Sequence, residues 1–288
     1  MKINIITDNS ASLSTEFLER EKLIILPLLC FLEGESYNIL DLDDYDSFYE
    51  KLVNSEEFPK TSQPSLGEIL TSFKEALSDN PDYVFVMTIS KGLSGFYKNC
   101  LIAKEMLKDD RIIIVDTRTT TVNLKRMLEY LCQLRKLNLS KDEILDRLYK
   151  MRDGQQIYFI PENLEYLYRG GRLSKTSATV GDFLKIRPII SLFEDGSLGL
   201  YKKVRGEKNA LKTLESYISK EIKYISVVYV LKKDKALELK NKIQNDFPHV
   251  EVLFEEVSPN IGCHIGPGTI GILFGTYRNL EEKYETVN

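Results

Sequence analysis

An apolar run from Val84 to Ile89 is followed by a short polar segment, Ser90–Gly95, and then by a helical pattern. A continuous apolar run of this length is typical of a central parallel strand that is covered on both faces. The polar segment would then lie at the carboxyl end of the sheet, where open α/β folds bind ligands. The apolar positions that we expect to form the buried face of the helix are Leu101, Ile102, Met106 and Leu107.

Strands alternate with helices from residue 1 to about residue 154, which predicts parallel βαβ units. The other strands predicted in this half are Ile3–Ile6, Leu23–Leu26 and Ile112–Val115. The predicted helices are 12–21, 41–52, 66–77, 122–136 and 141–151, two of them opened by the capping boxes of Ser65 with Glu68 and Ser140 with Glu143. Three strands end in polar loops, which we expect along one edge of the sheet: Thr7–Ser10, Ser90–Gly95 and Asp116–Thr121.

The pattern changes after Gly154. Residues 186–204 read as a β-hairpin around Asp195-Gly196, and Pro161 is expected in the first turn of a helix that ends at Gly170-Gly171. The remaining elements expected are strands at 157–160, 224–231, 250–257 and 269–274 and helices at 209–222 and 233–247. The sequence therefore predicts two α/β domains: a Rossmann-like parallel-sheet domain of residues 1–154 and an α+β domain of residues 155–288, with a ligand in the cleft between them.

Composition narrows the class of protein. A net charge of −4 and a pI near 5.5 argue against a broad nucleic-acid surface. Four isolated cysteines without a C-x-x-C pair favour neither a disulfide framework nor a zinc site, so we expect no metal. The start of the chain lacks the apolar core of a signal peptide, and we expect a cytoplasmic protein with at most transient membrane contact.

The polar segment after the central strand invites two interpretations. Gly92-Leu93-Ser94-Gly95 resembles a nucleophile elbow, but Phe96 stands where the second glycine of G-x-S-x-G would be. The backbone N–H groups at a helix start, together with the Ser94 hydroxyl, also suit a small anion. An ordinary strand-to-helix turn is the structural alternative.

A catalytic serine would need a base, and the chain has two histidines. His249 precedes a predicted strand and is expected at the surface. His264 lies in Gly262–Gly268, a predicted loop whose glycines and proline suggest close approach of a ligand or of backbone. His264 is therefore the better functional candidate.

Three further motifs carry polar or charged side chains. Thr61 and Ser62 lie in a predicted loop between two prolines, where they either cap a helix or donate hydrogen bonds to a carboxylate. Asp8 and Asp116 follow strands as magnesium ligands do, but no phosphate loop accompanies them, so we interpret them as turn caps. Arg169-Gly170-Gly171-Arg172 is a basic helix end that either complements the helix dipole or contacts a phosphate or a partner.

Taken together, these motifs resemble the DegV family of bacterial fatty-acid-binding proteins. The matching pieces, in chain order, are Thr7–Ser10, Thr61–Pro64, Gly92–Gly95, Leu164–Ser174, residues 185–205 and Gly262–Gly268. Each piece is weak alone, but their order and spacing cover nearly the whole chain and make the resemblance specific.

The resemblance implies a long-chain fatty acid buried between two domains and no catalytic residue or cofactor in this chain. Its carboxylate would be held by Thr61 with Ser62 and by Ser94 with Gly95, beside His264. A separate fatty-acid kinase would phosphorylate the bound carboxylate, and Arg172 with Arg169 would face that partner and the incoming phosphate.

The sequence departs from the family's usual pattern at Lys91, Phe96 and Asp116-Thr117. Lys91 and Phe96 flank the head-group loop, so the resemblance does not fix the geometry of that loop or the preferred acyl chain. Two other functions stay open on the residues alone. One is a serine esterase or acyl hydrolase that uses Ser94 and His264. The other is a sensor of a small anion, which an apolar tunnel would argue against.

Overall fold

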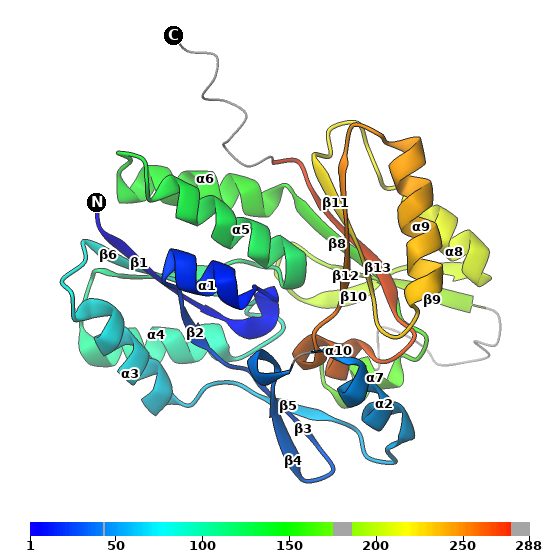
Figure 1. Cartoon of the computed structure of the whole chain (residues 1–288), viewed down its shortest axis with the longest axis horizontal. Coiled ribbons are helices and arrows are strands. Elements are labelled where there is room, and N and C mark those ends of the chain that lie inside the picture. The colour runs from blue at the N-terminus through cyan, green and yellow to red at the C-terminus, as the bar shows by residue number, and fades with distance from the viewer. Residues whose placement is uncertain (43, 175–185, 278–288) are drawn as a thin grey trace.

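The computed structural model describes residues 1–42, 44–174 and 186–277, which form three β-sheets and the helices that cover them (Figure 1). One sheet is parallel and four-stranded, one is mixed and six-stranded, and one is antiparallel and three-stranded. The predicted α/β class, with a parallel sheet in the first half and a mixed sheet in the second, is confirmed.

The parallel sheet has the strand order β2-β1-β6-β7. Its strands are β1 (Ile3–Asp8), β2 (Ile24–Leu26), β6 (Tyr83–Thr88) and β7 (Ile112–Asp116). β6 lies between β1 and β7, and its side chains alternate between two cores, as expected for a central strand. Phe85 packs with helices α5 (Thr121–Leu134) and α6 (Lys141–Asp153), whereas Val86 packs with α3 (Leu66–Leu77) and α4 (Phe96–Leu107).

The buried face of α4 differs from the prediction. Leu101, Ile102 and Met106 are exposed, Met106 to 58%. The helix instead buries Phe96, Cys100 and Ala103, which are spaced at helical intervals from its first residue. The positions of the apolar residues alone predicted the wrong face, because Phe96, the first residue of the helix, packs against the sheet and sets which face is buried.

The mixed sheet has the order β10-β9-β8-β13-β11-β12. Its strands are β8 (Gln155–Ile160), β9 (Ile186–Leu192), β10 (Leu198–Arg205), β11 (Tyr224–Tyr229), β12 (Glu251–Glu256) and β13 (Ile270–Gly275). Helices α8 (Glu207–Glu215) and α9 (Lys233–Asp246) cover one face. The predicted hairpin is confirmed, with Gly196 at a positive φ of 85° in its turn.

The third sheet interrupts the βαβ pattern, and its strand at Lys60–Ser62 was predicted as a loop. It consists of β3 (Leu29–Leu32), β4 (Glu35–Asn38) and β5 (Lys60–Ser62) in the order β4-β3-β5. With α2 (Asp46–Asn54) and α10 (Pro259–Ile265), it packs into the same core as the inner face of the mixed sheet. A segment of the first half therefore shares a core with the second half, and the domain boundary at Gly154 stays a prediction.

Several predicted bounds need correction. α2 begins at Asp46 rather than at residue 41, after a short helix η2 (Ile39–Asp41), and α8 ends at Glu215 rather than at residue 222. α7 (Glu165–Arg169) begins four residues after Pro161, which directly follows β8 and is not in the helix's first turn. The remaining helices are η1 (Asn9–Ala11) and α1 (Thr15–Glu21), and both capping boxes form as predicted.

The three polar loops meet at the carboxyl edge of the parallel sheet, as predicted. The Ile89 amide donates to Asp8 Oδ2 at 2.7 Å, and the Ser90 amide donates to the Thr119 carbonyl at 2.9 Å. Asp116 Oδ1 accepts from the Lys91 amide at 3.1 Å. Both aspartates therefore act as turn caps, and they fix the loop that carries Ser94.

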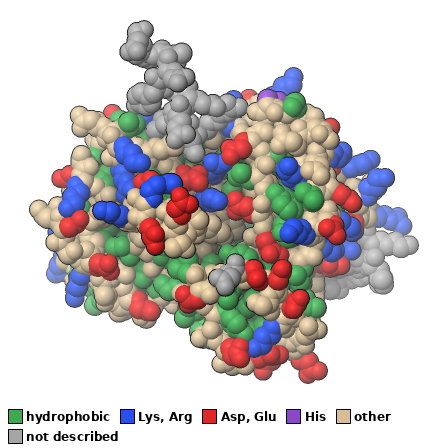
Figure 2. All heavy atoms as spheres, in the orientation of Figure 1, with side chains coloured by type: hydrophobic (Ala, Val, Ile, Leu, Met, Phe, Trp, Pro, Cys, Tyr) green, Lys and Arg blue, Asp and Glu red, His purple; other side chains and the backbone are tan. Residues whose placement is uncertain are grey.

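Across the described residues, we find no helix that combines the length and the apolar character needed to span a bilayer. On the face shown in Figure 2, lysine and arginine side chains lie among aspartate and glutamate side chains.

Candidate functional site

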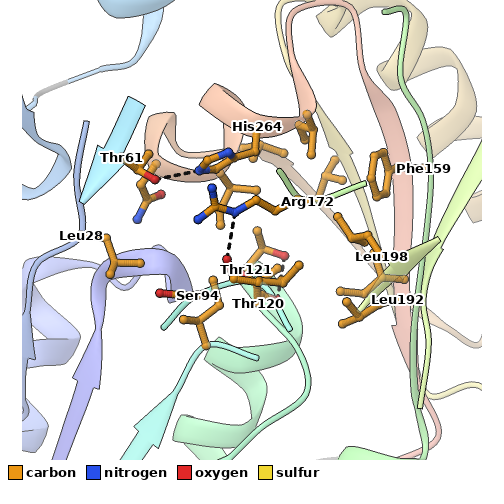
Figure 3. A pocket seen from close by; sticks show the side chains of 18 of the residues that line it. Leu28, Thr61, Ser94, Thr120, Thr121, Phe159, Arg172, Leu192, Leu198 and His264 are labelled. Carbon is orange, nitrogen blue, oxygen red and sulfur yellow. Dashed lines mark hydrogen bonds between the residues drawn. The ribbon is translucent and has the colours of Figure 1, made fainter. Parts of the chain in front are cut away.

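A cavity of about 410 Å³ lies between the loops at the edge of the parallel sheet and the inner face of the mixed sheet. This volume is in the range of small-molecule sites, roughly 300–1,000 Å³. Figure 3 shows polar side chains at one end (Thr61, Ser94, Arg172 and His264) and apolar side chains at the other (Phe159, Leu192 and Leu198). The cavity is amphipathic.

Thr61 and His264 are joined by a hydrogen bond across the polar end. The distance from Thr61 Oγ1 to His264 Nε2 is 2.7 Å. Thr61 lies on strand β5, and His264 on helix α10, so neither residue lies in the loop that the sequence predicted. Residues 203 positions apart thus meet because β5 and α10 share a core.

The imidazole of His264 is neutral at physiological pH. Burial, assisted by the nearby Arg172 charge, lowers its pKa to about 3. Its Nδ1 atom is buried and has no hydrogen-bond partner among the described residues. The proton therefore belongs on Nε2, because an N–H at Nδ1 would be left unpaired and unpaired buried donors are costly.

In this tautomer His264 Nε2–H donates to Thr61 Oγ1. Ser94 is placed similarly, because its Oγ accepts a hydrogen bond from the Phe96 amide at 3.2 Å. Each hydroxyl thus accepts from the protein, and its own hydrogen is available to an acceptor in the cavity. The polar end presents two hydroxyl donors.

Arg172 supplies positive charge at the same end. Its Nε donates to the Leu93 carbonyl at 3.1 Å and its Nη1 to the Gly170 carbonyl, and no carboxylate of the described residues lies within ion-pair distance. Burial lowers the pKa of this guanidinium, but not enough to remove its charge near neutral pH. Arg169 lies elsewhere: its side chain pairs with Glu165 at 2.8 Å, stacks over Phe58 and does not line the cavity.

The loop after β1 helps to hold α10 in place. Asn260, which lines the cavity, donates to Asn9 Oδ1 at 3.0 Å. Asn9 in turn donates to the Leu28 carbonyl at 3.2 Å and accepts from the Leu28 amide at 2.8 Å. The buried asparagine pair therefore connects the parallel sheet to the helix that carries His264.

Of the predicted site residues, Thr61, Ser62, Ser94, Arg172 and His264 all line the cavity. Gly95 does not; it caps α4, and a side chain there would meet Gln63 Oε1 at 2.5 Å. Sequence reasoning missed the lining residues Gln63, Thr120, Thr121 and Asn260 and the apolar wall from the mixed sheet. Thr120 and Thr121 could have been found, because they belong to a polar run that follows a predicted strand. The apolar wall could not, because the alternation of side chains along a strand does not tell which face of β8 or β9 lines a cavity.

The amphipathic cavity between the two sheets matches the chemistry of a ligand with a polar head and an apolar body. Residues 2–276 match the sequence model described as "Uncharacterised protein, DegV family". The chain belongs to the DegV family.

Curated relatives and solved structures agree over nearly the whole chain. A DegV domain-containing protein of Listeria monocytogenes is 30% identical over 276 residues, covering 94% of this chain and 97% of the relative. The crystal structure of a protein named as a fatty acid binding DegV family protein, from Streptococcus agalactiae, aligns with a TM-score of 0.88 and 27% identity, covering 96% of this chain and all of that one. DegV of Bacillus subtilis, named as a fatty acid binding protein, aligns with a TM-score of 0.83 and 28% identity over 96% of this chain and 99% of its own.

Proposed function

We propose that this protein binds a long-chain fatty acid in the amphipathic cavity, with the carboxylate at Thr61 and Ser94 and the acyl chain against the mixed sheet. The observation that carries the proposal is a pair of hydroxyls at the polar end, of which Thr61 is hydrogen-bonded to the neutral His264 imidazole and Ser94 accepts from the Phe96 amide. Both are left as donors, and a carboxylate accepts from two donors at once. Arg172 adds an electrostatic attraction without a competing carboxylate among the described residues.

The apolar end accounts for most of the affinity. Phe159 from β8, Leu192 from β9 and Leu198 from β10 line it. Each methylene removed from water contributes about 0.8 kcal/mol, so an acyl chain of about fourteen methylenes gains roughly 11 kcal/mol before entropic costs. A sensor of a small anion would not need this wall, and solved relatives named as fatty acid binding support the lipid.

We further propose that the chain is a non-catalytic carrier that presents the carboxylate to a separate fatty-acid kinase in the cytoplasm. Arg172 beside the head group is suited to attract the charge of an incoming phosphoryl group. Arg169 is exposed and does not line the cavity, and we propose that it contacts the partner's surface. The protein itself then needs no cofactor and only transient contact with a membrane.

The esterase alternative would need Ser94 activated by His264. The hydrogen-bond partner of His264 Nε2 is Thr61 rather than Ser94, and Nδ1 has no carboxylate to orient the ring among the described residues. A nucleophile, a base and an orienting group in hydrogen-bond contact are the signature of such catalysis. The arrangement therefore favours binding over hydrolysis.

The test starts with full-length protein purified from bacterial cells, extracted under denaturing conditions and analysed by mass spectrometry. We expect about one long-chain fatty acid per chain, and delipidated protein should rebind palmitate. Protein that carries no fatty acid and does not bind palmitate would contradict the proposal. Turnover of an acyl ester that is abolished by Ser94→Ala would instead establish a hydrolase. The proposed kinase partner is tested separately, by measuring acyl-phosphate formation with a purified kinase and ATP.

A further inference from the structure

The imidazole of His264 is held from two sides. Its Nε2 donates to Thr61 Oγ1 at 2.7 Å, and Figure 3 shows the ring beside Thr61 with Arg172 next to it. On the side of Nδ1 lies Gly170, where a Cβ would be 2.6 Å from Nδ1 and 3.5 Å from Cε1. Non-bonded heavy atoms pack best at roughly 3.5–4.0 Å, so the ring occupies the space that a side chain at Gly170 would need.

The backbone at Gly170 does not itself require a glycine. Its φ of −70° and ψ of −11° lie in the right-handed helical region, which all residues adopt. The next residue, Gly171, is different: its φ is 72°, and no atom of the described residues lies within 4 Å of its Cβ position. Gly171 is therefore suited to its backbone conformation, whereas Gly170 is suited to its place by having no side chain.

The chain around Gly170 is anchored, so it cannot easily move away from the ring. The Gly170 amide donates to the Tyr166 carbonyl at 2.9 Å, and the Gly170 carbonyl accepts from Arg172 Nη1. The amides of Arg172 and Leu173 both donate to the carbonyl of Leu167, whose side chain is completely buried. A clash at Gly170 would therefore be relieved mainly by the imidazole.

The cavity is the direction in which the imidazole can move. Thr61 blocks the ring on one side and Gly170 on the other, and His264 lines the cavity between them. A ring turned into the cavity would lose its hydrogen bond to Thr61 and, without a ligand, would meet water. Its pKa would then rise from about 3 towards the ordinary value, because burial is the main cause of the lowered pKa and the Arg172 charge the second.

We infer that Gly170 is a positioning residue for the head-group site: by having no side chain, it leaves the space in which the His264 ring lies and so keeps Nε2 on Thr61. The part of this inference that concerns the carboxylate rests on the proposed function. Gly170 also accepts from Arg172 through its carbonyl, so one residue contacts both basic side chains at the polar end.

A purely structural role for Gly170 is the alternative. A Cβ at this position would also lie 2.9 Å from the Tyr166 carbonyl oxygen, which belongs to the preceding turn of helix α7. A clash with that oxygen would destabilise the helix end without moving His264. The two interpretations therefore differ in what happens to the imidazole.

The first experiment follows the protonation of His264 by NMR in delipidated, full-length protein labelled with ¹⁵N-histidine, between about pH 5 and pH 8. The His264→Ala spectrum assigns the signal. We expect the ring to stay neutral over this range in the unmodified chain and to take up a proton within it in Gly170→Ala. Gly171→Ala, strained in its backbone but remote from the ring, is the matched control and should leave the ring neutral. A neutral ring in Gly170→Ala, or the same titration in Gly171→Ala, would overturn the inference.

The second experiment asks whether removing the ring relieves the clash. Gly170→Ala should lower the melting temperature by about 3 °C or more in the unmodified chain and by less than half as much in the His264→Ala background. An equal loss in both backgrounds would assign the clash to the Tyr166 carbonyl and overturn the inference. If Gly170→Ala alone does not fold, the double variant decides: it should fold, and its failure to fold would contradict the role of His264.

The third experiment measures the effect on the proposed ligand. Gly170→Ala should raise the Kd for palmitate at least tenfold and the Kd for methyl palmitate much less, whereas Gly171→Ala should leave the preference for the acid unchanged. The same preference in Gly170→Ala as in the unmodified chain would overturn the effect on the head group. If the unmodified chain binds no palmitate, the proposed function fails, while the NMR and melting experiments still decide whether Gly170 positions His264.

Discussion

Replacing Thr61 by valine tests the head-group geometry directly. Valine keeps the shape of the side chain and removes the hydroxyl that accepts from His264 Nε2 at 2.7 Å. In the ligand complex the variant loses one hydrogen bond to a carboxylate, which contributes about 1.5–3 kcal/mol. The Kd for palmitate should therefore rise by about 10- to 150-fold.

The ligand's charge separates this effect from damage to the fold. Methyl palmitate has the same acyl chain without the anionic carboxylate, so its affinity should fall much less, and the preference for the acid should shrink. Thr71→Val is the matched control, because Thr71 is exposed and donates to the Gly67 carbonyl within helix α3. The assay is displacement of a fluorescent fatty acid from delipidated protein. An unchanged preference for palmitate over its methyl ester in Thr61→Val would refute the role assigned to Thr61.

Three further predictions follow from burial and packing. His264 takes up a proton near pH 6.5 in the unfolded chain and only near pH 3 in the folded chain, so its contribution to the free energy of unfolding is complete above pH 6.5 and falls as the pH drops towards 3, by at most about 4–5 kcal/mol. Melting temperatures measured against pH should therefore decline less steeply for His264→Asn, and equal slopes would contradict the assignment. Gly262→Ala places a Cβ against the hydroxyl oxygen of the buried Tyr49 and should lower the free energy of unfolding by about 1–3 kcal/mol. Gly67→Ala, on the exposed side of α3, should raise it by roughly 0.5–1 kcal/mol, and chemical denaturation that ranks the two variants the other way would be inconsistent with this packing. Leu198→Phe fills part of the apolar end and should weaken palmitate more than decanoate in the displacement assay, so an equal loss for both would argue against an acyl chain at that wall.

The sequence predicts well those features that local chemistry decides. The central strand, the capping boxes and the Asp-Gly hairpin depend on neighbouring residues, and all are present. The buried face of α4 was predicted wrongly, because it depends on where the helix meets the sheet. Likewise, β5 pairs with β3, so the secondary structure at Thr61 is decided by a partner about thirty residues away rather than by its own prolines.

The candidate site shows the same division. The polar residues Thr61, Ser94 and His264 were visible as motifs, since hydroxyls and a histidine between glycines and prolines are chemically conspicuous. The apolar wall was not visible, because Phe159 and Leu192 look like any other strand residues and only the topology turns them towards the cavity. Residues 175–185, which include the first residue of the matching piece 185–205, lie outside the described residues. The end of the predicted second domain, from residue 278, lies outside them as well.

The neutral state of His264 is what makes the proposed head-group site suited to a carrier. A protonated imidazole would place a positive charge beside the carboxylate in a low-dielectric setting, where ion pairs are strong. With burial and Arg172 holding the pKa of His264 near 3, the imidazole instead orients Thr61 and leaves the carboxylate bound by hydroxyls. Under the proposed function, the carboxylate is then held by two hydroxyl donors beside the charge of Arg172, and a protonated His264 would place a second buried cation at the same end of the cavity.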